Sequence, residues 1–213
     1  PLTPLTFLER AASVFPKKTA IIHGDLRRSY VEFYARSRQL ASALKQLNVA
    51  RGETVSVMLA NTPAMLECHY GVPMCQAVLH AINTRLDAVA IAFQLDHAEA
   101  KVVIVDREFM PVMQDALKRA TVEPTLIQYD DPEYDVPKVD LGAIDYDAFV
   151  GGGDADFAWL MPLDEWDAIS INYTSGTTGN PKGVVYHHRG AYLLAQGNAL
   201  TTSMGKHLSL IHI

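Results

Sequence analysis

Apolar residues recur along the first 129 positions in two alternating patterns, one typical of helices and one typical of buried strands. Apolar side chains three or four positions apart predict helices over residues 4–14, 31–47, 86–97 and 109–120. A further helix is expected to begin at Pro63, after a cap from Asn61-Thr62, and to stop or kink at Pro73. β-Branched and aliphatic runs predict strands over 19–23, 54–59, 78–82, 101–105 and 124–129. This alternation predicts an α/β fold with a parallel sheet covered by helices.

The pattern changes after residue 129. Residues 130–167 contain three prolines and a run of three glycines, and we interpret them as a connection with one short helix near 146–150. Apolar runs at 166–173 and 184–186 then flank a loop of glycine and hydroxyl residues, which predicts a strand, loop and strand hairpin, and a helix is expected over 190–204. The predicted division is an N-terminal α/β subdomain (1–129), a connecting segment (130–167) and the start of a second subdomain (168–207).

Composition and charge add functional limits. A chain of 213 residues that is 49% hydrophobic can form one large domain or two small ones, and its net charge of −6 argues against a nucleic-acid partner. Residues 130–167 hold twelve carboxylates and one base, Lys138, and we expect a solvated acidic face. Residues 168–213 hold no carboxylate, only Lys182, Arg189 and Lys206 as charged residues. This excess of positive charge would attract a negatively charged polyphosphate.

The cysteines and histidines do not form a metal-binding pattern. Cys68 and Cys75 lie in an apolar segment and are expected to be buried thiols in a reducing cytosol. The sequence shows no apolar run long enough to span a membrane and no secretory signal, so we expect a cytoplasmic protein without a transmembrane segment. Most of the eight histidines stand alone and are expected to be satisfied or exposed. His187 and His188 are expected to pack at a helix entry, with substrate contact as the alternative.

The candidate chemistry lies in the hairpin loop from Tyr173 to Gly183, Y-T-S-G-T-T-G-N-P-K-G. Its glycines let the backbone approach a ligand closely, while four hydroxyls and Lys182 supply donors for an anion. It differs from the G-x-x-x-x-G-K-[ST] phosphate loop, because Pro181 stands where that motif has its second glycine. The composition by itself leaves open an ordinary surface hairpin.

The order of residues from Tyr173 to Val184, Y-T-S-G-T-T-G-x-P-K-G-V, resembles the phosphate-loop signature of the AMP-forming acyl-CoA synthetases, part of the adenylate-forming superfamily. The segments at 71–74, 83–86, 130–134 and 164–167 are similar to segments of bacterial and plant short- and medium-chain members, including the 3-methylmercaptopropionate–CoA ligases. The resemblance extends to residue 206 or 207. It implies that a carboxylate attacks the α-phosphorus of ATP to give acyl-adenylate and pyrophosphate, after which the coenzyme A thiolate displaces AMP.

The resemblance also implies site residues. ATP, Mg²⁺ and coenzyme A are the expected cofactors, and a small carboxylic acid is the expected substrate. Lys182 is the candidate catalytic residue, and Thr174 is the candidate contact for Mg²⁺. The residues expected to bind the ATP phosphates are Thr174, Ser175, Gly176, Thr177, Thr178, Gly179 and Lys182.

Several motifs of that family do not occur in the sequence: the Y-G-x-T-E-like glutamate motif, the adenine- and ribose-contacting motifs, and the C-terminal lysine. We therefore expect an N-terminal fragment that has no ligase turnover by itself. Residues 208–213, L-S-L-I-H-I, match the translation of a transposon-based sequencing adapter, so we expect a non-native tail, with a native strand as the alternative. Two other functions stay open: another adenylate-forming enzyme that activates an amino acid or aryl acid, and a non-catalytic nucleotide-binding α/β module.

Overall fold

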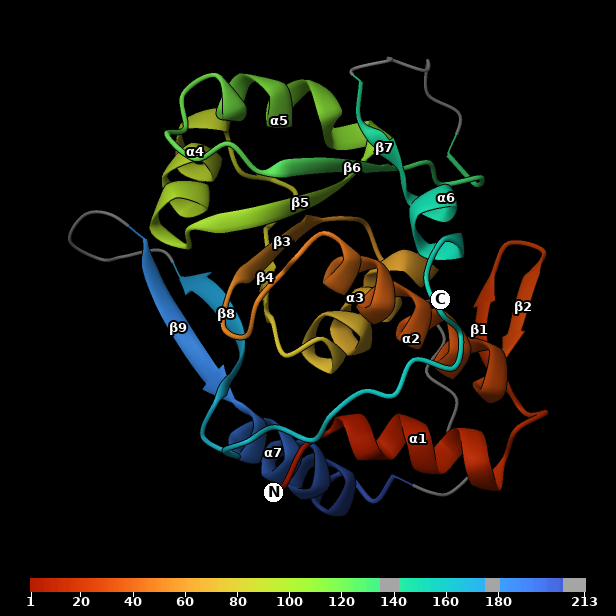
Figure 1. The fold of residues 1–213 in the computed structure, drawn as a ribbon. Coiled ribbons are helices and arrows are strands. Elements are labelled where there is room, and N and C mark those ends of the chain that lie inside the picture. Colours follow the sequence, from red (N-terminus) through yellow and green to blue (C-terminus); the bar gives the residue numbers. More distant parts are fainter. Residues whose placement is uncertain (135–141, 175–180, 205–213) are drawn as a thin grey trace.

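The computed structural model describes residues 1–134, 142–174 and 181–204 (Figure 1). The helices within these ranges are α1 (Leu5–Val14), α2 (Tyr30–Gln46), α3 (Pro63–Met74), α4 (Ala88–His97), α5 (Met110–Leu117), α6 (Tyr146–Gly151) and α7 (His188–Thr201), with a 3₁₀ turn at Arg107–Phe109. The strands are β1 (Thr19–His23), β2 (Leu26–Ser29), β3 (Thr54–Met58), β4 (Val78–Ala81), β5 (Ala100–Asp106), β6 (Thr125–Tyr129), β7 (Ile144–Asp145), β8 (Ala168–Thr174) and β9 (Lys182–His187).

The described strands form a seven-stranded sheet in the order β7-β6-β5-β3-β4-β8-β9, beside a small hairpin of β1 and β2. Every neighbouring pair in the large sheet is parallel except β8 and β9, which are antiparallel. The predicted α/β class with a parallel-rich sheet is therefore confirmed. Because β8 pairs with β4, strands from before and after residues 130–167 share one sheet, and the predicted division into subdomains stays a prediction.

The sheet has a hydrophobic core on each face, and β5 contributes to both. Val102 and Ile104 pack in the cluster beneath α1, α2, α3 and α6, whereas Val103 and Val105 pack in the cluster with α4 and α5. Successive side chains of a strand point to opposite faces, so a strand covered on both sides must be apolar at every position. Figure 1 shows α4 and α5 on the other side of the sheet from α2 and α3.

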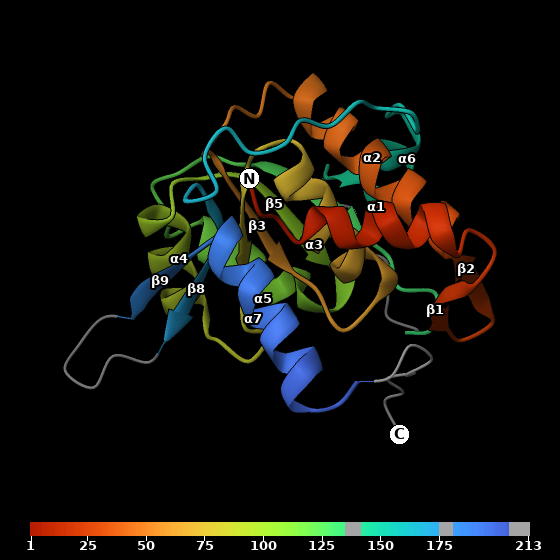
Figure 2. The same ribbon diagram turned by 90° about the horizontal axis from the view of Figure 1, so that it is seen from below.

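The N-terminal segment lies beside the first turns of α7, the last described helix (Figure 2). The rings of Phe7 in α1 and Tyr192 in α7 stack with their centroids 4.7 Å apart. The Thr3 hydroxyl lies 2.9 Å from Nδ1 of the buried His188, at the start of α7. The helix that begins the chain thus helps to place the helix that follows the hairpin.

One local prediction was wrong, and one strand was missed. Thr62 occupies the N-cap position of α3, but its buried hydroxyl makes no capping hydrogen bond, so Pro63 at the first turn is the start signal that the structure uses. The strand β2 was not predicted, because Leu26-Arg27-Arg28-Ser29 has no apolar alternation. It forms since Gly24, with φ of +51°, turns the chain back onto β1.

The predicted solvated acidic face over residues 130–167 is confirmed for most of its described carboxylates, which are exposed, but Asp131 is buried and the ion pairs of the segment were not predicted. Within the described ranges, bases outside the segment pair with six of its carboxylates. The first residues after α6 also follow α2, where the amides of Gln46 and Gln39 donate to the carbonyls of Gly152 and Gly153. The ion pairs are Asp130–Arg107, Asp131–His23, Asp147–Arg36, Asp156–Arg38, Glu165–Arg189 and Asp167–Arg51.

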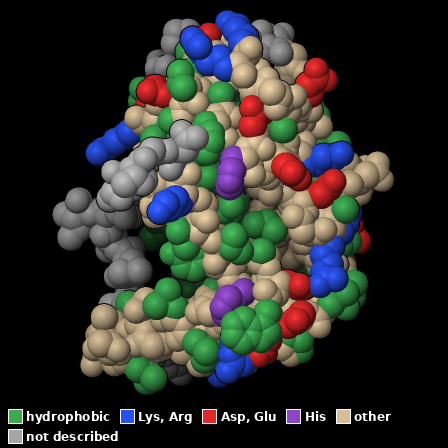
Figure 3. All heavy atoms as spheres, turned by 90° about the vertical axis from the view of Figure 1, so that its left-hand side faces the viewer, with side chains coloured by type: hydrophobic (Ala, Val, Ile, Leu, Met, Phe, Trp, Pro, Cys, Tyr) green, Lys and Arg blue, Asp and Glu red, His purple; other side chains and the backbone are tan. Residues whose placement is uncertain are grey.

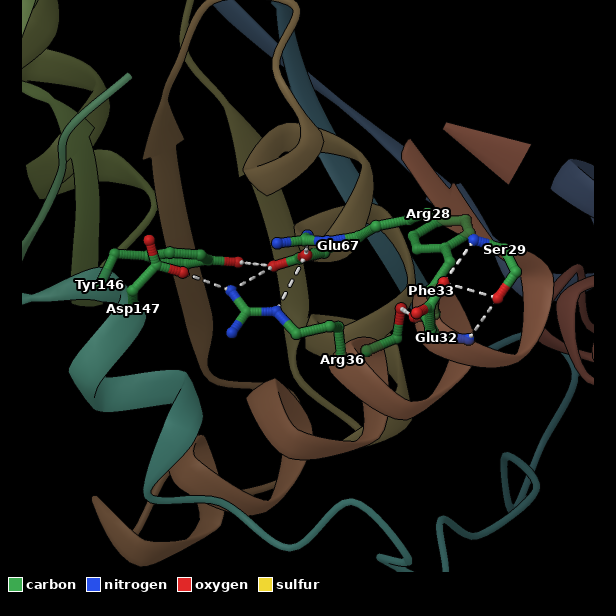
Figure 4. Close-up of polar contacts among 9 residues, drawn as sticks. Arg28, Ser29, Glu32, Phe33, Arg36, Glu67, Tyr146 and Asp147 are labelled. Atoms are coloured by element: carbon green, nitrogen blue, oxygen red, sulfur yellow. Dashed lines mark hydrogen bonds and ion pairs between the residues drawn. The ribbon is translucent and has the colours of Figure 1, made fainter. Parts of the chain in front are cut away.

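A buried carboxylate, Glu67 of α3, joins four elements on one side of the sheet (Figure 4). It forms an ion pair with Arg28 of β2, accepts from Nε of Arg36 in α2 at 3.1 Å, and accepts from the hydroxyl of Tyr146 in α6 at 2.8 Å. Burial and the Glu67 carboxylate raise the pKa of Tyr146, so the phenol keeps its proton and donates. A buried charge requires such a complete set of partners.

Candidate functional site

The predicted hairpin is present, and it brings the two ends of the candidate loop together. In the antiparallel pairing of β8 with β9, Thr174 lies directly opposite Lys182, and Tyr173 lies opposite Gly183. Thr174 and Lys182 are therefore neighbours at the open end of the hairpin. The other predicted site residues, Ser175, Gly176, Thr177, Thr178 and Gly179, lie outside the described residues, and their role stays a prediction.

The electrostatic setting of this hairpin end favours an anion. Both Thr174 and Lys182 are exposed, and no carboxylate in the described parts of the chain forms an ion pair with the Lys182 ammonium. The sequence from residue 168 onward has no carboxylate. A cation without a counter-ion, next to an exposed hydroxyl, is a suitable partner for phosphate oxygens.

A cavity of about 510 Å³ adjoins the end of the hairpin. It lies where β4 and β8 end, and the carboxyl ends of neighbouring parallel strands are the usual ligand-binding edge of an open α/β sheet. The segment after β4, for which no site was predicted, forms one wall of the cavity. The lining residues are Ala81, Ile82, Asn83, Leu86, Gln94, Asn172, Tyr173, Thr174 and Pro181.

The same side of the molecule carries apolar side chains, which gather in the middle of the face in Figure 3. Trp166 and three consecutive residues of β9, Val184, Val185 and Tyr186, are exposed. A second, shallower hollow of about 290 Å³ lies between β8, β9 and α7 and is lined by Ser170, Asn172, Tyr186, Ala191, Leu194, Ala195 and Asn198.

His80 and His97 both contact Tyr173, the residue that precedes Thr174. The Tyr173 hydroxyl lies 2.6 Å from Nδ1 of His97, and its ring centroid lies 5.0 Å from that of His80. His80 is fully buried, and burial lowers its pKa to about 4, so its ring is neutral near pH 7. The prediction that these histidines are satisfied or exposed is confirmed, but their common contact with Tyr173 was missed, because it joins positions that are distant in sequence.

The predicted packing of His187 and His188 at the start of a helix is confirmed. Nδ1 of His187 accepts a hydrogen bond from the Gly190 amide at 2.9 Å and so caps α7. His188 is buried against Thr3, and burial lowers its pKa to about 4. Neither ring lines the cavity beside Thr174.

The cysteines also follow the prediction: both are buried and unpaired, and burial raises the pKa of Cys75 to about 11. In the part of the chain that the structure describes, no three metal-ligating side chains of His, Cys, Asp or Glu lie together. None of the described helices is both long and apolar enough to cross a membrane. Thr174 as a contact for Mg²⁺ stays a prediction.

Comparison with known proteins is consistent with this geometry. Residues 8–211 match the family described as AMP-binding enzyme. The chain is 44% identical over 214 residues to a peroxisomal acetate/butyrate–CoA ligase of Arabidopsis thaliana, covering 95% of this chain and 38% of that protein. It is 46% identical over 205 residues to an acetate–CoA ligase of Humulus lupulus, covering 91% of this chain and 36% of that protein.

A solved structure supports the same relationship. The crystal structure of an anthranilate CoA ligase in complex with anthranoyl-AMP superimposes with a TM-score of 0.83 and 26% identity, covering 92% of this chain and 37% of that chain. The chain therefore spans less than two fifths of the length of the relatives that it matches.

Proposed function

The chain belongs to the AMP-binding enzyme family, and we propose that it supplies the phosphate-binding hairpin of an ATP-dependent carboxylic acid–CoA ligase. The observation that carries this proposal is the pairing of Thr174 with Lys182 at the end of a hairpin whose sequence has the Y-T-S-G-T-T-G-x-P-K-G order. The 44% and 46% identical relatives are both named as CoA ligases. We propose this activity for a longer protein that contains the chain, because the chain spans less than two fifths of its relatives.

The charge and the hydrogen-bond donors of the described residues suit the phosphates of a nucleoside triphosphate. Lys182 offers an exposed ammonium, Thr174 an exposed hydroxyl, and the adjacent cavity gives room beside them. A hydrogen bond to a charged group contributes about 1.5–3 kcal/mol net, and one ammonium beside a phosphate gains about 4 kcal/mol of gross attraction at an effective dielectric of ~20. Several donors together therefore outweigh the lysine alone.

The chemical role of these residues follows from charge. A substrate carboxylate must approach the α-phosphorus of ATP, and both partners are negative. The Lys182 ammonium and the hairpin hydroxyls would hold the phosphates in place and neutralise part of their charge, which lowers the cost of that approach. A carboxylate oxygen then bonds to the α-phosphorus and pyrophosphate leaves, after which the coenzyme A thiolate bonds to the acyl carbon and AMP leaves.

The fit for Mg²⁺ is limited to one ligand in the described residues, the Thr174 hydroxyl. This is compatible with magnesium, which takes few protein oxygens and completes its shell with water and substrate phosphates. When bound, the ion would neutralise phosphate charge. We therefore keep Thr174 as the proposed magnesium contact and assign no other ligand.

Exchange of labelled pyrophosphate into ATP, in the longest native protein that contains this chain, tests the proposal. We expect exchange that depends on acetate, butyrate or a medium-chain acid, and acyl-CoA formation when coenzyme A is added. Exchange with amino acids or aryl acids alone would favour the alternative adenylating enzymes. ATP binding without exchange for any acid would favour the non-catalytic nucleotide-binding module.

A cytoplasmic location remains part of the proposal. The Arabidopsis relative is named as peroxisomal, so peroxisomes are the competing compartment. Microscopy of a fluorescent fusion of the native protein distinguishes the two, because a peroxisomal protein gives punctate signal that coincides with a peroxisomal marker.

A further inference from the structure

The end of the hairpin extends beyond the main sheet. The parallel pairing of β8 with β4 covers two positions, Ser170 opposite Leu79 and Ile171 opposite His80. The antiparallel pairing of β8 with β9 continues to Thr174. The pairing with β4 therefore ends three residues before Thr174, so side chains must fix the hairpin end relative to the interior of the sheet.

Tyr173 lies in this overhanging part and contacts two elements of the main body. Its hydroxyl makes a 2.6 Å hydrogen bond with Nδ1 of His97, at the last position of α4. Burial raises the pKa of Tyr173, so the phenol keeps its proton and can donate it to Nδ1 in the His97 tautomer that carries its proton on Nε2. The tyrosine ring also packs on the rings of His80 and His97, at centroid distances of 5.0 and 5.6 Å.

His80 is itself fixed from two sides. Its Nε2 lies 3.3 Å from Oε1 of Gln94 in α4, and its Nδ1 lies 2.8 Å from Oγ of Ser56 in β3. Because the Gln94 oxygen only accepts, Nε2 carries the proton and Nδ1 accepts from the Ser56 hydroxyl. All three side chains are buried, so the surface that Tyr173 meets is rigid and joins β3, β4 and α4.

Gly183 leaves the space that this packing needs. It lies opposite Tyr173 in the hairpin, and a Cβ there would come within 2.8 Å of Cδ1 of Ile171 and 3.4 Å of Cζ of Tyr173. A larger residue at this position would push the end of the Ile171 side chain aside, next to the last position of β8 that pairs with β4.

We propose that Tyr173, held by His80 and His97, is a positioning residue that sets where Thr174 and Lys182 lie at the edge of the cavity. The role rests on the proposed function, since it assigns these two groups to the nucleotide phosphates. Tyr173 acts through its neighbour Thr174 and through the pairing of Thr174 with Lys182. Its own hydroxyl is already engaged by His97 and needs no contact with the ligand.

Calorimetric titration with ATP tests this role in the longest native protein that contains the chain. Tyr173→Phe removes only the hydroxyl, and His97→Ala removes its partner. We expect each variant to bind ATP about fivefold more weakly, the effect of one lost hydrogen bond. The double variant should lose no more than either single one, because both break the same contact. His97→Asn should keep most of the affinity, since its amide oxygen also accepts a hydrogen bond.

His69→Ala is the matched control, because His69 is another exposed helical histidine whose Nδ1 bonds only a local carbonyl, that of Met65. It should leave ATP affinity unchanged. Unchanged affinity in Tyr173→Phe, or additive losses in the double variant, would overturn the positioning role while the proposed function stands. Absence of ATP binding in the unmodified protein would overturn both. A lower melting temperature with unchanged ATP affinity would show a purely structural contact and so also overturn the role.

Discussion

The network around Glu67 and the end of the β8–β9 hairpin use charge in opposite ways. Glu67 is buried, and two arginines and a tyrosine satisfy it. Lys182 is exposed, and no described carboxylate pairs with it. A satisfied buried charge stabilises the fold, whereas a charge without a counter-ion is available for a ligand. This difference separates a structural region of the chain from the proposed phosphate site, and it predicts which substitutions change stability and which change binding.

The largest effect on stability is expected in the buried network around Glu67. Glu67→Ala leaves Arg28 and Arg36 without their buried counter-ion and should lower the free energy of unfolding by about 3–5 kcal/mol. Urea unfolding followed by circular dichroism measures this loss. Asp115→Ala is the control, because its pair with Lys118 is exposed on both sides. A loss of stability no greater than that of the control would remove the distinction between the two regions.

His80 represents a third case, a base that is kept neutral by burial. Its pKa falls from 6.5 to about 4 in the folded state, so between these values the unfolded chain binds more protons. Stability should therefore fall as the pH is lowered from 6.5 to 4, by about 2 kcal/mol at pH 5 for this one group. His80→Asn, which cannot titrate in this range, should flatten the pH dependence of the unfolding midpoint.

The parts of the fold that sequence reasoning predicted correctly are those fixed by local pattern. The buried stripe of Leu5, Leu8 and Ala12 places α1 on the core, and the apolar run of β5 reflects burial on both faces. The hairpin could be predicted because two apolar runs flank a glycine-rich loop. These signals lie within a few residues of each other.

The features that were missed depend on pairs distant in the chain. Tyr173 and His97 are 76 positions apart, and Glu67 and Tyr146 are 79 apart, so no local pattern reports these contacts. The ion pairs of residues 130–167 were missed because most of their arginine and histidine partners lie far away in sequence. A carboxylate-rich segment beside a chain with a basic remainder could have suggested pairing, but not which residues pair.

An intermediate effect, on ATP affinity, is expected at the exposed end of the β8–β9 hairpin. Lys182→Ala should weaken ATP binding about tenfold without abolishing it, because the other donors of the hairpin remain. The free energy of unfolding should not change, since the ammonium has no described partner in the fold. Titration with ATP and urea unfolding of the same samples measure both quantities. Lys118→Ala, another exposed lysine, is the control for general charge, and equal affinity in both variants would contradict the assignment of Lys182.

The smallest effect tests whether the acidic segment is held by its ion pairs or by its packing. Asp156 pairs with Arg38 at 3.2 Å but is 92% exposed, so Asp156→Asn should change the free energy of unfolding by no more than about 0.5 kcal/mol. The nearby indole of Trp159, whose Nε1 donates to the Tyr34 hydroxyl at 2.7 Å, packs against the buried core. Trp159→Phe keeps the apolar contact but removes the donor, and it should cost more than Asp156→Asn. A larger loss of stability in Asp156→Asn than in Trp159→Phe, measured by urea unfolding, would mean that the exposed ion pair holds this segment more strongly than the packing of the indole does.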